Sequence, residues 1–151
     1  MKSNDLAHRR GTLRAYLVEG SGLLRARLAR IIVALEGVEL VGTAQDIATA
    51  APSLGVLVPD VVILGLTSGQ PATRQWLGAL TTLGQDCRLI VLMPGGAGPL
   101  RRIYLDAGAH HAFDKTAEIA ELRKTLIRMS GHAGPRTGMT RTPPKQENDN
   151  V

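Results

Sequence analysis

The stretch PDVVILGLTSG, from Pro59 to Gly69, decides the fold class. Its unbroken apolar run from Val61 to Leu64 is typical of a strand in a parallel sheet that helices cover on both faces. Turn residues follow the run, at the carboxyl edge where open α/β sheets hold their ligands. A reactive side chain is expected where the run stops, but the residue there is Gly65. The stretch therefore predicts the edge of a site whose central position is empty.

Similar apolar runs alternate with amphipathic segments along the chain. Strands are expected over 13–18, 38–44, 60–65, 88–93 and 110–114. Helices are expected over 22–36, 46–58, from near 71, over 99–107 and over 116–130, with Pro52 shortening or kinking the second. Ser21 or Gly22, Asp46 and Thr116 are candidate helix caps, and Gly108, Ser130 and Gly131 are candidate stops. Five strands alternating with five helices predict a doubly wound parallel sheet.

The length of 151 residues predicts one domain. We expect a flexible basic arm over 1–11, an α/β domain over 12–130 and a disordered tail over 131–151, where polar and turn residues show no periodicity. No apolar run approaches the roughly 20 residues that a membrane span needs, and no hydrophobic signal-peptide core is present. The single cysteine, Cys87, excludes an internal disulfide and is expected to be inert. A cytoplasmic protein is expected.

The net charge of +5 raises the question of a nucleic-acid partner. Much of the excess comes from Lys2, Arg9, Arg10 and Arg14 in the first fourteen residues. Aromatic residues make up only 3%, which disfavours a base-stacking surface. The charge pattern therefore indicates a mildly basic domain rather than a nucleic-acid-binding one.

Three segments together resemble the receiver domain of two-component response regulators: PDVVILGL (59–66), RLIVLM (88–93) and AGAHHAFDK (107–115). The resemblance covers about residues 12–130. It implies a flavodoxin-like five-stranded sheet with the strand order 2-1-3-4-5 and five surrounding helices. It also implies a place in signal transduction.

The resemblance implies five chemical positions at the carboxyl edge of the sheet. The acidic pair of the family falls on Glu19 and Gly20, and the phosphoacceptor aspartate falls on Gly65. The hydroxyl residue falls on Met93, and the lysine falls on Lys115, which matches. Because glycine has no side chain to phosphorylate, the chain resembles an atypical, stand-alone pseudo-receiver with a vestigial phosphorylation site.

These departures predict that the site has no catalytic residue, no cofactor and weak metal binding. Magnesium is usually held by one or two carboxylates with waters and phosphate oxygens, and only Glu19 remains of the acids. We predict that Glu19 contacts Lys115 and closes the site; the alternative is that both side chains are solvated at a loop edge. Met93 cannot make the hydroxyl hydrogen bond, and Ala112 replaces the switching aromatic, which favours one constitutive conformation.

The resemblance also implies a partner surface on the fourth helix, the fifth strand and the fifth helix. This surface would offer Arg101, Arg102, Tyr104, His110, His111, Phe113, Arg123 and Lys124. Arginine and tyrosine are frequent anchors in protein interfaces. The expected partner is a sensor kinase, another regulator or a second copy of the chain. The alternative is an ordinary solvated surface with Phe113 facing inward. The two histidines are expected to have structural or surface roles.

These observations favour a non-enzymatic signalling module that binds a protein partner without aspartyl phosphorylation. Two alternatives stay open. One is a nucleic-acid-associated regulator that uses the basic arm around His8, Arg9 and Arg10, whose binding would fall steeply with salt. The other is a small-molecule sensor with a ligand in the pocket that Gly20 and Gly65 leave vacant.

Overall fold

The computed structural model describes residues 12–67, 86–95 and 98–136. Its elements run in the order β1 (Leu13–Val18), α2 (Gly22–Val33), β2 (Val38–Ala44), α3 (Ile47–Leu57), β3 (Val61–Gly65), β4 (Arg88–Met93), the short 3₁₀ helix η1 (Gly98–Leu100), α5 (Arg101–Ala107), β5 (His111–Asp114) and α6 (Ile119–Arg136). The expected helix near residue 71 falls outside the described residues.

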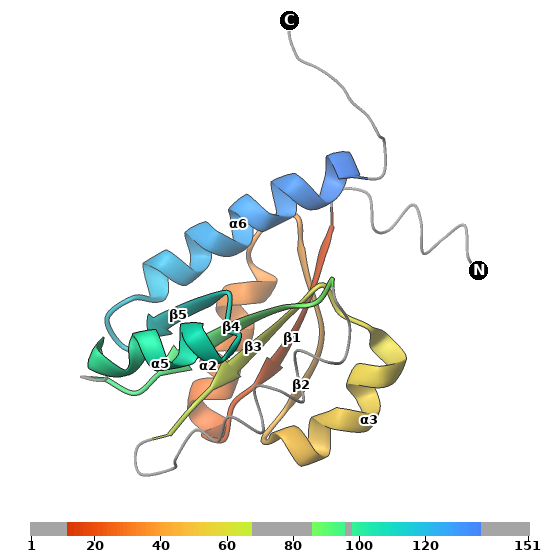
Figure 1. The fold of residues 1–151 in the computed structure, drawn as a ribbon. Helices are drawn as coiled ribbons and strands as arrows, with labels where there is room; N and C mark the ends of the chain where they lie inside the picture. Colours follow the sequence, from red (N-terminus) through yellow and green to blue (C-terminus); the bar gives the residue numbers. More distant parts are fainter. Residues whose placement is uncertain (1–11, 68–85, 96–97, 137–151) are drawn as a thin grey trace, which may run out of the picture.

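The five strands form one parallel sheet in the order β2-β1-β3-β4-β5, which confirms the predicted flavodoxin-like topology (Figure 1). Each strand is a short apolar run, and β3 and β4 are buried along almost their whole length. Such runs need helices on both faces, because a parallel sheet with an exposed face would leave half of its apolar side chains in water.

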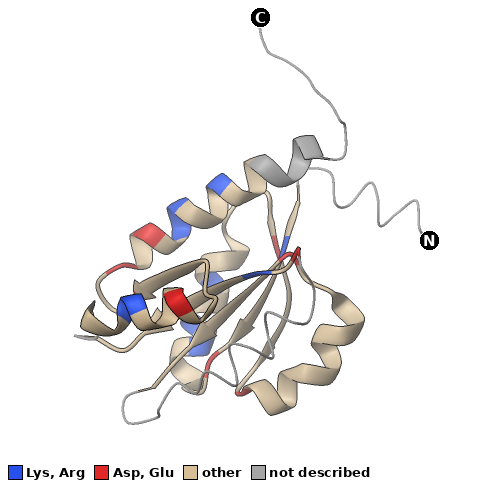
Figure 2. Cartoon of the chain, in the orientation of Figure 1, with Lys and Arg blue, Asp and Glu red and all other residues tan. Residues whose placement is uncertain are grey.

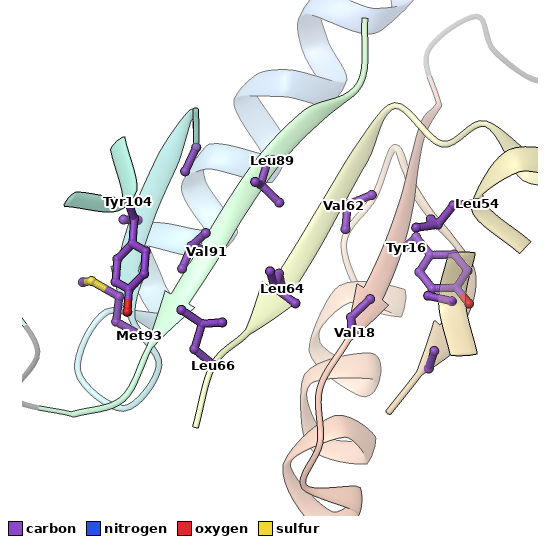
Figure 3. Packing of buried hydrophobic residues seen from close by; sticks show 14 residues of the cluster. Tyr16, Val18, Leu54, Val62, Leu64, Leu66, Leu89, Val91, Met93 and Tyr104 are labelled. Atoms are coloured by element: carbon purple, nitrogen blue, oxygen red, sulfur yellow. The ribbon is translucent and has the colours of Figure 1, made fainter. Parts of the chain in front are cut away.

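Two apolar clusters lie on opposite faces of the sheet. On one face, alternate strand residues pack against α3 and α5, and this cluster includes Tyr16, Leu54, Met93 and Tyr104 (Figure 3). On the other face, the intervening strand residues pack against α2 and α6 through a second cluster that includes Leu28 and Leu122. The period-two alternation along β1 therefore decides which helix pair each side chain meets.

The helix caps show where local sequence chemistry works as expected. The Ser21 hydroxyl accepts a hydrogen bond from the Leu24 N–H at 3.2 Å, and Asp46 Oδ1 accepts one from the Thr49 N–H at 2.7 Å. Gly108 has a φ of 126° and ends α5, as predicted. The helix α3 runs through Pro52 for 11 residues, so the proline does not stop it.

Two expectations about α6 are wrong. Ser130 and Gly131 do not end the helix, which continues to Arg136, because an exposed glycine weakens a helix without breaking it. Thr116 does not cap it either: its hydroxyl donates to Asp114 Oδ1 at 2.7 Å, and α6 begins at Ile119. The same carboxylate oxygen accepts from the Thr116 and Ala117 N–H groups, so the turn before α6 is built around Asp114.

Arg14 belongs to the folded domain rather than to a free basic arm. Its backbone N–H donates to Asp60 Oδ2 at 2.8 Å. Its guanidinium donates to the carbonyl oxygens of Leu57 at 2.6 Å and Val58 at 3.2 Å, which closes the end of α3. None of the described helices is long and apolar enough to cross a membrane.

Candidate functional site

The residues predicted for the vestigial site meet at the carboxyl edge of the sheet. Gly65 and Met93 end β3 and β4, and Glu19 and Lys115 directly follow β1 and β5. Because all strands are parallel, their carboxyl ends lie at one edge. The expected clustering of these positions therefore follows from topology.

An ion pair closes the centre of this edge. Lys115 Nζ lies 3.0 Å from Glu19 Oε1, and the Glu19 side chain is fully buried while that of Lys115 is 10% exposed. The predicted contact between Glu19 and Lys115 is confirmed, and the alternative of two solvated side chains is wrong. A buried pair of this kind has to be well hydrogen-bonded, because each charge loses its water on folding.

The backbone around Glu19 supplies the remaining hydrogen bonds. The Ser21 N–H donates to Glu19 Oε2 at 2.9 Å, so each carboxylate oxygen has a donor. The Glu19 carbonyl accepts from the Arg25 guanidinium at 2.8 Å, and the Glu19 N–H donates to the Ala44 carbonyl at 2.9 Å. The sequence pattern predicts Ser21 only as a candidate helix cap and carries no signal for the hydrogen bonds that Ser21 and Arg25 give to Glu19.

The Glu19 carboxylate occupies the space above Gly65. Strands β1 and β3 pair with Val18 opposite Leu64, so the next residues, Glu19 and Gly65, are neighbours on the same side of the sheet. A Cβ atom placed on Gly65 would collide with Glu19 Oε1 and lie 3.0 Å from its Cδ. A side chain at position 65 and the present position of Glu19 are therefore mutually exclusive.

The arrangement does not fit a magnesium ion. Both Glu19 oxygens are engaged by Lys115 and Ser21, and Gly20 and Gly65 supply no side-chain ligand. No cluster of three or more His, Cys, Asp or Glu side chains that could hold a metal is found in the described ranges. A divalent cation would have to displace the ammonium group of Lys115 to reach the one carboxylate.

Met93 and Ala112 are packed inside the domain. Met93 is fully buried and Ala112 is 3% exposed, both in the cluster that includes Tyr104 (Figure 3). The Met93 carbonyl also accepts from the Lys115 N–H at 2.8 Å, which fixes the lysine relative to β4. A flexible thioether fills space at a position where a hydroxyl would need a hydrogen-bond partner.

The residues predicted for a partner surface divide into two groups. Arg102 and Arg123 are exposed. Arg102 forms a solvent-exposed ion pair with Asp106 on the same helix, at 3.8 Å. Arg101 pairs with Glu118 at 2.9 Å and so links α5 to the start of α6. Tyr104 is wrong as a surface residue, because it is 6% exposed and faces the sheet.

The β5 side chains are also partly inside. His111 and Phe113 lie on the same face with ring centroids 5.8 Å apart and planes 14° apart, and Phe113 packs against the second cluster. Their neighbour His110 has a backbone role: its Nδ1 accepts from the Leu89 N–H at 3.0 Å, and its N–H donates to the Leu89 carbonyl at 2.8 Å. Nothing in the sequence pattern signals this hydrogen bond.

Two pKa values reflect these surroundings. Burial, and then the charge of Arg88, lowers the pKa of His110, which keeps Nδ1 free to accept its hydrogen bond. Burial, and then the charge of Asp60, raises the pKa of the Cys87 thiol to about 11. Cys87 is therefore a thiol rather than a reactive thiolate at neutral pH.

No protein-family model and no curated protein matches the sequence. The fold is nevertheless similar to those of solved receiver domains. The signal receiver domain of NarL from Mycobacterium tuberculosis is 20% identical, with 80% of this chain and 97% of that chain covered and a TM-score of 0.67.

Two further structures give the same result. The isolated receiver domain of RcsB from Salmonella enterica serovar Typhimurium, solved with the phosphomimetic BeF3−, is 14% identical, with 89% of this chain and 94% of that chain covered and a TM-score of 0.67. A chain of the CheX–CheY–BeF3−–Mg complex from Borrelia burgdorferi is 20% identical, with 78% and 88% covered and a TM-score of 0.66. The chain therefore has the receiver fold.

Proposed function

We propose that this chain is an atypical, non-enzymatic signalling module of the receiver type, which binds a protein partner without being phosphorylated on an aspartate. The observation that carries the proposal is the position of the Glu19 carboxylate. It lies above Gly65 and is paired with Lys115, so the two charges neutralise each other inside the site. A phosphoryl group brought to this edge would find no nucleophile at position 65 and a lysine, Lys115, that is already paired with Glu19.

The receiver fold supports a role in signalling, by analogy with the response regulators that share it. One of those structures holds CheY in a complex with CheX, a protein–protein assembly. A module that can no longer be phosphorylated keeps its outer surface, which is the part that a protein partner would bind. We place this module in the cytoplasm, where its proposed partners would be a sensor kinase, a regulator or a second copy.

The face formed by α5, β5 and α6 is the proposed partner surface. Each of its two helices carries an exposed isoleucine, with Ile103 46% and Ile127 51% exposed. Arg102 on α5 and Arg123 on α6 add exposed cations, and Figure 2 shows the charged positions along both helices. Exposed apolar side chains flanked by arginines are typical of protein interfaces.

A nucleic-acid role is less well supported. Arg14, one of the cations that suggested it, is bound to the end of α3 within the folded domain. The other basic residues around His8 lie outside the described part of the chain. The protein interface therefore remains the favoured proposal.

The first experiment tests the loss of phosphoryl chemistry. The full chain is incubated with Mg²⁺ and acetyl phosphate and its intact mass is measured, with a receiver domain that keeps its acceptor aspartate as the positive control. We expect no change in mass under conditions that phosphorylate the control. A gain of one phosphoryl group would contradict the proposal, and mapping the label would identify another acceptor.

The second experiment tests the surface. The tagged chain captures partners from a lysate of its own cells, and self-association is measured by sedimentation. We expect the same partner, or the same dimer, with and without acetyl phosphate, and its loss in the Arg102→Glu/Arg123→Glu variant. The matched control is Arg30→Glu, which reverses an exposed charge on α2, outside the proposed face. Equal loss in both variants, or in neither, would contradict the surface proposed.

A further inference from the structure

A second feature of the same sheet edge is a cavity of about 290 Å³ between β1, β3 and the start of α3. Val18 and Leu64 line it from the two strands, and Ile47 lines it from the first turn of α3. Val18 and Leu64 belong to the cluster that faces α3. Gly65, above which the Glu19 carboxylate lies, also lines the cavity, so the cavity adjoins the Glu19–Lys115 pair. Strand order reverses between β1 and β3, which is where open α/β sheets bind ligands.

Gly20 leaves the cavity open because it has no side chain, although the backbone conformation at this position would accept other residues. Gly20 lines it, and a Cβ placed there would meet only the Gln45 carbonyl oxygen, at 3.7 Å. The φ of Gly20 is not in the left-handed region, so a side chain at this position is free of backbone strain. The volume is at the lower end of the range for small-molecule sites, which indicates a ligand of modest size.

The charges around the cavity select the kind of ligand. Among the described residues that line the cavity, Asp46 is the only charged one, and none of them carries a cationic side chain. Gln45 and Thr67 add neutral polar residues to its lining. The first-turn Thr49 N–H of α3, which could otherwise attract an anion, already donates to Asp46 Oδ1 at 2.7 Å. An anionic ligand would therefore face a carboxylate, and a cation would be attracted to it.

The ionisation of Asp46 agrees with this choice. Hydrogen bonds from the Thr49 backbone and then its side chain lower the pKa of Asp46. The carboxylate is therefore charged throughout the neutral range.

We propose that this cavity binds a small organic cation with an apolar body, such as an arylalkyl amine. The apolar body would pack on Val18, Ile47 and Leu64, and the ammonium group would lie at the rim beside Asp46 and Gln45. The cavity adjoins the Glu19–Lys115 pair through Gly65, but binding of an amine there does not depend on the proposed signalling function, so either proposal can fail without the other.

The test uses three probes that share a phenyl ring and differ in charge: phenethylamine, phenethyl alcohol and hydrocinnamate. Each is titrated into the 15N-labelled full chain, and amide shifts are followed by NMR. We expect phenethylamine to bind most tightly, with the shifts concentrated at Gly20, Gln45 and Thr67, and hydrocinnamate to produce no saturable shift. Absence of a saturable shift with phenethylamine up to its solubility limit, or equal binding of the anion, would overturn the proposal.

Two variants locate the binding. Gly20→Val fills the cavity and should abolish phenethylamine binding, whereas Gly55→Ala, on α3 with open space around its new methyl, should not change it. Asp46→Asn keeps a good helix cap and removes the charge. It should weaken phenethylamine binding by about threefold, as expected for an exposed ion pair, and leave phenethyl alcohol unchanged. Unchanged phenethylamine binding in either Gly20→Val or Asp46→Asn would overturn the proposal. The Asp46→Asn result decides this by itself if Gly20→Val does not fold.

Discussion

At the scale of single residues, the decisive feature is the position of the Glu19 carboxylate above Gly65 and beside Lys115. Glu19 extends from the end of β1 into the space that a side chain on Gly65 would need, and there it meets Lys115. The loss of a side chain at position 65 and the burial of Glu19 are therefore two parts of one arrangement. The site keeps a carboxylate next to its lysine while it lacks a residue that could be phosphorylated at position 65.

Breaking the buried ion pair should destabilise the protein strongly, because one buried charge would be left without its partner. Replacing Glu19 by alanine leaves the ammonium group of Lys115 and the Ser21 N–H without their partner in a buried place. We expect Glu19→Ala to lower the free energy of unfolding by about 3 kcal/mol in urea titrations. Glu19→Gln keeps a hydrogen-bond acceptor and should lower the free energy of unfolding by less than Glu19→Ala does. A Glu19→Ala variant as stable as the wild type would show that the pair carries no weight.

The competition between Glu19 and a side chain at position 65 can be measured with a double-mutant cycle. Gly65→Asp alone should destabilise the domain by about 2 kcal/mol, because the new Cβ collides with the Glu19 carboxylate. In a Glu19→Ala background the same change should cost at least about 1 kcal/mol less. Urea unfolding of all four proteins gives the coupling. Strictly additive effects would contradict the steric argument.

His110 should make stability depend on pH. Its pKa is lowered in the folded protein, so the unfolded chain, with a histidine pKa of about 6.5, takes up the proton first as the pH falls. The contribution of neutral His110 to the free energy of unfolding is therefore complete above about pH 6.5 and is lost as the pH falls below that value. We expect urea unfolding between about pH 7.5 and pH 5 to show a smaller loss of stability in His110→Ala than in the wild type. Identical slopes would indicate that the Leu89–His110 hydrogen bond does not matter.

At the scale of secondary-structure elements, α3 stands apart from the other helices. It contains no charged residue from Ile47 to Leu57, as its uniform tan colour in Figure 2 shows. It is held by caps at both ends, Asp46 at its start and Arg14 at its end, and it carries Pro52 in its interior. The caps and the burial of Leu54 compensate for a proline that removes one helix hydrogen bond.

Removing that proline should therefore stabilise the protein. Pro52 is exposed, and alanine would restore an N–H to the helix without a loss of buried area. The greater freedom of the unfolded chain offsets part of the gain, so we expect Pro52→Ala to raise the free energy of unfolding by about 1–2 kcal/mol. Gly55→Ala, in the same helix and in open space, is a control that should add up to about 1 kcal/mol. A destabilised Pro52→Ala would mean that the proline fits a locally required geometry.

The elements also show how far the sequence determines the structure. The strands were predictable because each buried run has the length and composition of a parallel strand, whereas their order was implied by the resemblance to receiver domains. The sequence does not determine which of two adjacent apolar residues on a short helix faces the sheet. On α5, Tyr104 is buried and Ile103 is 46% exposed. The continuation of α6 past Gly131 was missed for a similar reason, because helix ends depend on small differences in free energy.

The candidate site was also predictable only in part. The contact of Glu19 with Lys115 follows from parallel strands that end at one edge. The position of the carboxylate above Gly65 and its bond to the Ser21 N–H depend on side-chain geometry, which periodicity does not contain. The acceptor role of His110 depends on a specific approach to Leu89, which lies 21 residues away in the chain.

At the scale of the whole molecule, the interior next to the proposed partner surface is filled. Met93 at the end of β4 and Tyr104 on α5 lie close together (Figure 3), and Ala112 of β5 belongs to the same buried cluster. A switch that passes from the sheet edge to this surface needs two packings of similar free energy and a chemical event that biases them. Gly65 offers no carboxylate for such a chemical event, and the side chains of Met93 and Ala112 are a thioether and a methyl group.

The surface should therefore be insensitive to a phosphoryl mimic. We expect the 15N-labelled chain to show no amide shifts in α5, β5 or α6 when Mg²⁺ and beryllofluoride are added, at concentrations that shift the spectrum of a receiver domain that keeps its acceptor aspartate. The physical reason is that Lys115 is already neutralised by Glu19, and Gly65 offers no carboxylate to the mimic. Saturable shifts in these three elements would show that the coupling survives without the aspartate. In that case Glu19→Gln, which leaves Lys115 with a neutral partner, should enlarge them.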